Sequence, residues 1–116
     1  MNIPSEIRAG DTVKWRDNSS NDVFGNEIKS DDWTLKYYLR TNERPSGHTS
    51  TGTAYSTGWE FTISASDSAD FEPGTWYWQA IAEKDSEKIT LGYGNLTVEA
   101  ALEYSGTPGL FDGRSQ

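Results

Sequence analysis

Apolar and polar residues alternate along three stretches of the chain, and a period of two predicts β-strands. The clearest stretch spans residues 59–64 and reads WEFTIS, which places its tryptophan, phenylalanine and isoleucine on one face. The same alternation occurs in residues 12–16 (TVKWR) and 33–40 (WTLKYYLR). Each of these strands is therefore expected to bury one face and expose the other.

A fourth stretch, residues 75–82 (TWYWQAIA), carries bulky side chains on both faces and is predicted to be a central strand. In residues 89–98 the apolar residues first occupy odd-numbered positions (89, 91 and 93) and then even-numbered ones (96 and 98). A β-bulge at residues 92–94 would restore a single inward face by adding one residue. The polar link 85–87 has the length of a hairpin turn, so we expect the last two strands to pair antiparallel.

Two shorter segments, residues 3–7 and 53–55, bring the predicted count to about seven strands in roughly 100 residues. Pro4 restricts the first segment to an edge strand, because proline has no backbone N–H to donate. No stretch shows a convincing helical period. We therefore predict an all-β fold, an immunoglobulin-like (fibronectin III-like) antiparallel β-sandwich over residues 1–100, with a barrel as the main alternative.

The remaining segments are predicted to be connections. Residues 18–32 form one long loop, and residues 45–58 form a second that is either mobile or an extended edge. In the polar link 65–74, Phe71 is the one large apolar residue and is expected to plug the end of the sandwich. Residues 101–116 are predicted to be a linker or arm, disordered in isolation. Candidate contact residues in this arm are Tyr104, Leu110, Phe111 and Arg114.

Composition adds constraints on the core and on the compartment. A length of 116 residues suits one domain. Apolar residues make up only 34% of the chain but aromatic residues 13%, so we expect an aromatic-rich core. There is no cysteine, so packing must hold the fold without disulfides. Neither a signal peptide nor a run of roughly 18 apolar residues is visible, so we expect neither export nor membrane insertion.

The chain is acidic, with a net charge of −8 and no Lys or Arg between Arg44 and Lys84. Nucleic acid is therefore a poor partner, because binding to phosphates needs clustered cations. The acidity favours solubility or docking to a basic protein surface.

Residues capable of catalysis are present but are not arranged for it. His48, the single histidine, lies in a Gly/Ser/Thr-rich segment and is expected to be a solvated loop residue. The pairs Asp31–Asp32 and Asp67–Asp70 lack the ligand spacing of calcium loops. The carboxylates are expected in turns or at outward strand positions, which disfavours acid–base hydrolysis. We predict no enzyme activity, no cofactor and no metal site.

The aromatic residues permit an alternative function. Exposed tyrosines on a β-sandwich stack against sugar rings in carbohydrate-binding modules, and Tyr38, Tyr55, Tyr77 and Tyr93 are candidates for such a platform. Core packing and shielding of sheet edges are the competing structural explanation.

Three stretches, IPSEIRAGDTVKW, PGTWYWQAIAE and YSGTPGLFDGRSQ, resemble a family of small uncharacterised proteins of tailed bacteriophages and prophages. Genes of that family lie in the block for virion morphogenesis, near head-tail joining proteins. The FDGRS ending is the most specific motif, whereas GDTVKW is common in β-sandwiches. Family members continue past this ending into a helical segment, so the resemblance implies that this chain corresponds to their N-terminal β domain.

The resemblance implies a non-catalytic structural or interaction module of a phage or prophage particle, in head-tail or tail assembly or in decoration. Its partners would be other virion proteins or further copies of itself, with no nucleic acid and no membrane. It would be present in the bacterial cytoplasm during assembly and then in the virion. A carbohydrate-binding β-sandwich module is the alternative function.

Overall fold

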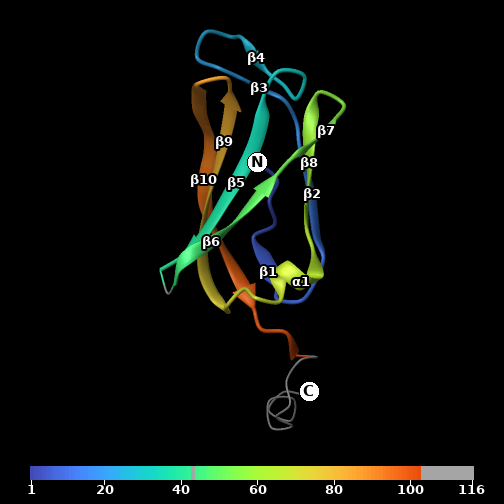
Figure 1. Ribbon diagram of the computed structural model, residues 1–116, viewed down its shortest axis with the longest axis vertical. Helices are drawn as coiled ribbons and strands as arrows, with labels where there is room; N and C mark the ends of the chain where they lie inside the picture. The colour runs from blue at the N-terminus through green and yellow to red at the C-terminus, as the bar shows by residue number, and fades with distance from the viewer. Residues whose placement is uncertain (43, 103–116) are drawn as a thin grey trace.

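The computed structural model describes residues 1–42 and 44–102, and within these ranges the chain forms ten strands and one short helix (Figure 1). The elements are β1 (Glu6–Arg8), β2 (Val13–Asp17), β3 (Ser20–Asn21), β4 (Glu27–Ile28), β5 (Thr34–Thr41), β6 (Arg44–Thr51), β7 (Thr53–Tyr55), β8 (Gly58–Ile63), α1 (Ala65–Ser68), β9 (Gly74–Lys84) and β10 (Glu87–Glu99). The all-β prediction is confirmed in its coarser form, since the fold is mostly β, but the short helix α1 was not predicted.

All seven predicted strands are present, but the count of seven is too low because β3, β4 and β6 are additional. Strands β3 and β4 pair with one another and have only two residues each. Two residues are too few to show an alternating pattern. Strand β6 lies at a sheet edge and contains no large apolar residue, so its sequence carries no strand signal. Of the two alternatives for this segment, the extended edge is the one observed.

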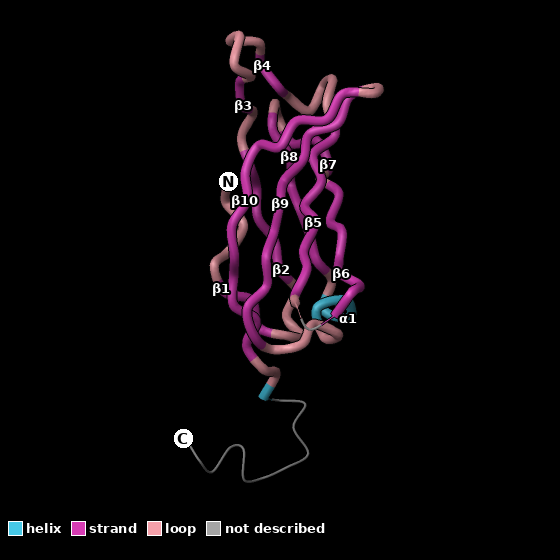
Figure 2. Tube along the Cα trace, turned by 90° about the vertical axis from the view of Figure 1, so that its left-hand side faces the viewer, coloured by secondary structure: helices cyan, strands magenta, loops and turns pink. Residues whose placement is uncertain are grey.

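The strands form a five-stranded sheet in the order β1-β10-β9-β5-β6 and a three-stranded sheet in the order β2-β8-β7. The larger sheet curls into a half-barrel around the core, with the smaller sheet facing it (Figure 2). Strand β1 runs parallel to β10, so the prediction of a purely antiparallel fold is wrong at this pair. The alternation of apolar residues does not reveal the direction in which a strand pairs. A short hairpin would imply antiparallel pairing, but the consecutive strands β1 and β2 belong to different sheets and form no hairpin.

Strand β9 lies between β10 and β5 and is the centre of the larger sheet, as predicted. Its register with β10 shifts between Thr90 and Gly92, so the bulge falls at Leu91, just before the predicted position. The two strands form a hairpin whose turn contains Asp85 in the left-handed region, with φ 54°. The predicted antiparallel pairing of the last two strands is confirmed.

The core is rich in aromatic residues, as the composition predicts. Tyr37 of β5 is completely buried and contacts rings from two of the three strands of the facing sheet. It packs edge-on against Trp15 of β2, with ring centroids 5.1 Å apart, and against Phe61 of β8 at 4.8 Å. Trp15 and Phe61 stack on each other at 5.0 Å. This cluster joins the two sheets.

A polar contact lies inside this aromatic cluster. The Tyr37 hydroxyl donates a hydrogen bond to the carboxylate of Asp17, a β2 residue with only 3% of its surface exposed. The backbone N–H of Asn2 donates a second hydrogen bond to this carboxylate at 2.6 Å. Burial and the neighbouring carboxylate raise the pKa of Tyr37 well above that of an ordinary tyrosine. The phenol therefore stays protonated and remains a donor to Asp17.

The chain passes from one sheet to the other at Gly52, the single residue between β6 and β7. The N–H of Gly52 donates to the carbonyl of Leu35 in the larger sheet at 2.9 Å. A Cβ atom at this position would lie 2.8 Å from the ring of Phe61 and 2.9 Å from the Cβ of Trp59. Glycine is therefore required for the close approach of the two layers.

A later crossing, from β8 to β9, closes the lower end of the core (Figure 1). Helix α1 begins after Ser64, whose hydroxyl accepts the N–H of Asp67 at 3.1 Å. Ser68 is fully buried, and its hydroxyl donates to the carbonyl of Asp11 at 2.7 Å. Phe71 is buried and stacks on Trp76 with ring centroids 4.8 Å apart, so the predicted plug is confirmed.

We predict that replacing Tyr37 by phenylalanine lowers the unfolding free energy by about 1–3 kcal/mol, because a buried carboxylate loses a donor. Urea denaturation followed by tryptophan fluorescence measures the change. Tyr38→Phe is the matched control, since it removes a surface hydroxyl and should change stability by less than about 0.5 kcal/mol. Equal effects of the two substitutions would contradict the role given to the Tyr37–Asp17 contact.

Candidate functional site

The outer face of the five-stranded sheet carries two cross-strand rows of aromatic and polar side chains. In the first row Tyr38 of β5 pairs with Gln79 of β9, which pairs in turn with Tyr93 of β10. In the next row Tyr77 of β9 lies between Arg40 and Asn95. The strand alternation that buries Tyr37 and Ala80 directs these neighbours to solvent.

These rows border an open groove of about 380 Å³. Its lining consists of Tyr38, Arg40, Tyr77, Trp78, Gln79, Tyr93 and Gly94. Trp78 and Gly94 are a cross-strand pair, and the Trp78 ring lies 3.0 Å from the place where a Cβ of residue 94 would be. A side chain at position 94 would therefore displace the Trp78 ring, which packs against the ring of Tyr37 with centroids 5.4 Å apart.

Hydrogen bonds and ion pairs hold the polar groups at the groove. The Tyr38 hydroxyl donates to Glu83 at 3.0 Å, and Lys36 pairs with the same carboxylate at 3.6 Å. Burial and the bond to Glu83 raise the pKa of Tyr38, which keeps its hydroxyl protonated. The Gln79 amide donates to the hydroxyl of Thr90 at 2.9 Å. The groove is thus preorganised by its own contacts.

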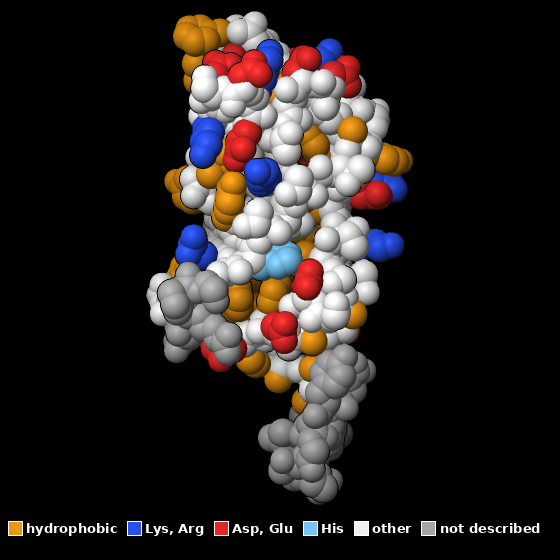
Figure 3. Space-filling model, in the orientation of Figure 1, with side chains coloured by type: hydrophobic (Ala, Val, Ile, Leu, Met, Phe, Trp, Pro, Cys, Tyr) orange, Lys and Arg blue, Asp and Glu red, His pale blue; other side chains and the backbone are white. Residues whose placement is uncertain are grey.

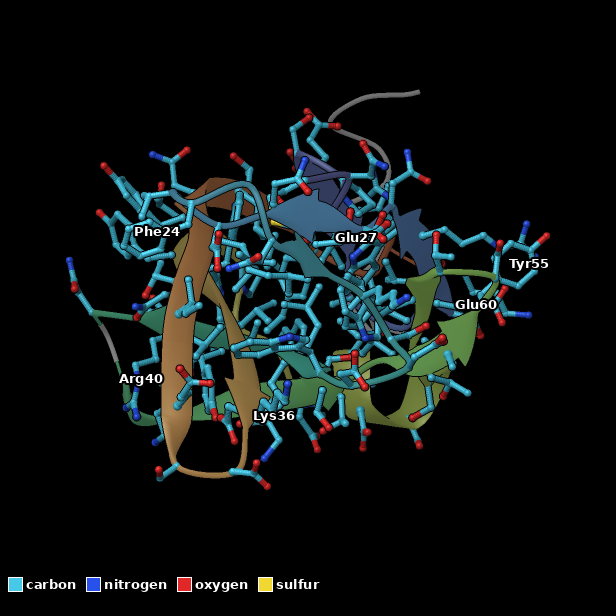
Figure 4. The ribbon with its side chains drawn as sticks, turned by 90° about the horizontal axis from the view of Figure 1, so that it is seen from above. Phe24, Glu27, Lys36, Arg40, Tyr55 and Glu60 are labelled. Atoms are coloured by element: carbon cyan, nitrogen blue, oxygen red, sulfur yellow. The ribbon has the colours of Figure 1, made fainter. Side chains whose placement is uncertain are left out.

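Tyr55, the fourth tyrosine of the predicted platform, lies elsewhere. It sits on β7 of the smaller sheet, with the Arg16 guanidinium 3.8 Å from its ring centroid. Arg16 also pairs with Glu60 at 2.9 Å. Figure 4 shows Tyr55 and Glu60 on one side of the molecule and Arg40 on the other. The structure therefore brings together three of the four tyrosines.

A second surface lies at the tip of the β3–β4 hairpin. Val23 and Phe24 occupy this tip with 93% and 86% of their surfaces exposed. A hydrophobic group stands at the upper left corner of the molecule in Figure 3, beside charged side chains, and Phe24 points away from the strands in Figure 4. Two adjacent apolar side chains in water contribute nothing to the core.

The hairpin turn has a defined conformation despite its exposure. One carboxylate oxygen of Asp22 accepts the backbone N–H groups of Phe24 and Asn26, both at 2.9 Å. Gly25 adopts φ 86°, a conformation that favours glycine. The hydrogen bonds, chiefly that from Asn26, lower the pKa of Asp22. The carboxylate is therefore ionised near neutral pH and fixes the turn that presents Val23 and Phe24.

A cleft of about 560 Å³ separates the hairpin from the start of β10. Its walls include Phe24 and the half-buried side chains of Ile89 and Leu91. Asp22 and Glu87 also line it. The arrangement is an apolar opening with acidic groups, of a size that accepts side chains of another molecule. Sequence reasoning placed the apolar residues of 18–32 in a loop but did not identify this cleft, because β3 and β4 are too short to be recognised.

The predicted contact residues of the C-terminal arm lie outside the described residues. These are Tyr104, Leu110, Phe111 and Arg114.

Two expectations about ionisable residues are corrected. His48 is not a solvated loop residue, because it lies half-buried on β6 with its ring 5.4 Å from that of Phe71. The carboxylates are not all outward or in turns, because Asp17 is buried. Asp17 lies two residues after Trp15 and four after Val13, so the alternation of the strand places it on the same buried face.

Residues 1–42 and 44–102 contain neither a cluster of metal ligands nor a membrane-spanning helix. No group of three or more His, Cys, Asp or Glu side chains in these ranges is placed to hold a metal ion. No helix in the same ranges has the length and hydropathy to cross a membrane.

No protein-family model matches the chain, and no curated protein matches it either.

We predict that His48 makes stability depend on pH between about 7.5 and 5.5. Its burial lowers its pKa below the ordinary value of about 6.5, with Asp67 opposing the shift. The unfolded chain then binds more protons than the folded one, so stability is lost as the pH falls. Urea denaturation at both pH values should show a smaller difference for His48→Gln. An unchanged difference would contradict this assignment.

Proposed function

We propose that this chain is a non-catalytic interaction module of immunoglobulin-like fold that acts through protein–protein contacts in a phage or prophage particle. The observation that carries the proposal is the exposed pair Val23 and Phe24 on a turn fixed by Asp22. Exposed apolar side chains on a preorganised backbone are typical of binding surfaces, because little conformational entropy is lost on contact.

The strand order supports the immunoglobulin-like assignment. Immunoglobulin domains pair strands A, B, E and D in one sheet and C, F and G in the other, and variable domains add C′ beside C. The order β10-β9-β5-β6 corresponds to G-F-C-C′, and β2-β8-β7 corresponds to B-E-D. Tyr37 on the C-equivalent strand β5 then fills the central place that a tryptophan holds in antibody domains.

This correspondence assigns the β3–β4 hairpin to a loop position of immunoglobulin domains. The hairpin lies between β2 and β5 and so occupies the B–C loop, while the β9–β10 turn is the F–G loop. Both lie at the upper end of the molecule in Figure 1. These two loops belong to the binding end of variable domains, which supports recognition at this end by analogy of fold.

The charges indicate the kind of partner. Asp22 and Glu87 line the cleft beside Phe24, and the whole chain carries a net charge of −8. A protein surface with an apolar pocket bordered by Lys or Arg would complement this end. The resemblance of three sequence stretches to proteins encoded among virion morphogenesis genes supports a partner in the particle.

We predict that the double substitution Val23→Ser and Phe24→Ser lowers the affinity of the domain for purified particles of the encoding phage about tenfold or more, as loss of an aromatic anchor does. Co-sedimentation with the particles measures binding. The melting temperature should be unchanged, because both side chains are already exposed. Tyr93→Ser, which removes an exposed ring from another face, is the matched control and should bind like the parent.

Binding of the double variant equal to that of the parent would remove the hairpin as the contact. No association of the parent with particles, and normal particle assembly when the gene is deleted, would overturn the proposed role in the virion.

A further inference from the structure

The groove on the outer sheet face is separate from the hairpin cleft and shares no lining residue with it. We propose that this groove binds a neutral oligosaccharide of two or more pyranose units, stacked on Tyr38 and Tyr93. The inference goes beyond the protein contact proposed above and rests on different residues.

The exposure of the tyrosines argues against a packing role. Tyr93 has 80% of its surface in water and Tyr77 has 45%, so neither is needed to fill the core. Gly92 and Gly94, on both sides of Tyr93 along β10, face the opposite side of the sheet, and the next residue on the face of Tyr93 is Asn95. A ring held in this way on a rigid central sheet offers its face to a ligand.

The spacing of the rings fits a chain of sugars. Tyr38 and Tyr93 occupy one cross-strand row with a single strand between them. Adjacent strands lie about 4.8 Å apart, so the two positions are separated by roughly 9–10 Å. One pyranose ring cannot cover both tyrosines at this separation, whereas two consecutive rings can. Tyr77, one row further along β9, extends the surface.

The polar groups between the aromatic rings can form hydrogen bonds with sugar hydroxyls. Gln79 lies between Tyr38 and Tyr93, and its amide is oriented by the bond to Thr90. An amide offers both donor and acceptor atoms, and the Arg40 guanidinium in the next row offers donors. A pyranose presents C–H groups on its faces and hydroxyls around its rim. Alternating rings and hydrogen-bonding groups match this distribution of apolar and polar surface.

The charges favour a neutral ligand. Lys36 beside the groove is paired with Glu83, which also accepts the Tyr38 hydroxyl. Among the described residues that line the groove, Arg40 is the one cation, and the whole chain has a net charge of −8. A polyanionic glycan would need several clustered cations. An uncharged oligosaccharide needs none.

The test is titration of the full chain with cellohexaose, maltohexaose, mannohexaose and chitohexaose, and with oligogalacturonate as the anionic probe. Isothermal calorimetry gives affinity, and tryptophan fluorescence is the second readout, since Trp78 is among the residues that line the groove. At least one neutral hexasaccharide should bind about tenfold or more tightly than its monosaccharide, because two rings stack instead of one. Tyr38→Ala and Tyr93→Ala should each weaken binding by about tenfold or more.

Control variants separate this proposal from the protein contact. The Val23→Ser and Phe24→Ser double variant should bind sugar like the parent, and Tyr55→Ala should too, since Tyr55 lies outside the groove. No binding of any neutral hexasaccharide at millimolar concentration would overturn the proposal. It would also fail if only the anionic probe bound, or if Tyr93→Ala left sugar binding unchanged.

Discussion

The contact of Tyr37 with the facing sheet is the interaction on which the rest of this fold depends. Its ring fills the space between β5 and the β2–β8 pair, and its hydroxyl reaches a carboxylate that has almost no access to water. An ionised group is expensive to bury unless it is fully hydrogen-bonded. Asp17 is tolerated because Tyr37 and the backbone of Asn2 both donate to it. The same contact therefore packs the core and fixes how the two sheets align.

The two candidate surfaces follow from this arrangement. Because Tyr37 points into the core, its neighbour Tyr38 must point outward, where it borders the groove. The β3–β4 hairpin follows directly on β2, the strand that ends at Asp17, so the sheet alignment also places the hairpin. Binding residues on loops and outer faces are displayed by a scaffold whose inner face is fully occupied.

The sequence predicted the strands that have one regular buried face, and it missed those without such a face. Residues 59–64 were recognised because burial imposed alternation on them, whereas β6 carries almost no apolar side chains to reveal it. The site was predicted in part. Tyr38, Tyr77 and Tyr93 were named as exposed, but only cross-strand register shows that they meet and that Tyr55 does not. Register depends on contacts distant in sequence, which a local pattern does not contain.

The parallel pairing of β1 with β10 has a mechanical consequence. The pair is joined near its two ends by hydrogen bonds of 2.9 Å, from Thr97 to Ser5 and from Ala9 to Glu99. A pull that draws the chain before β1 and the chain after β10 in opposite directions runs along both strands. Such a load shears these bonds together and does not peel them apart one at a time. Under such a load the β1–β10 pair would carry the force, with the core strands β5 and β9 outside its line.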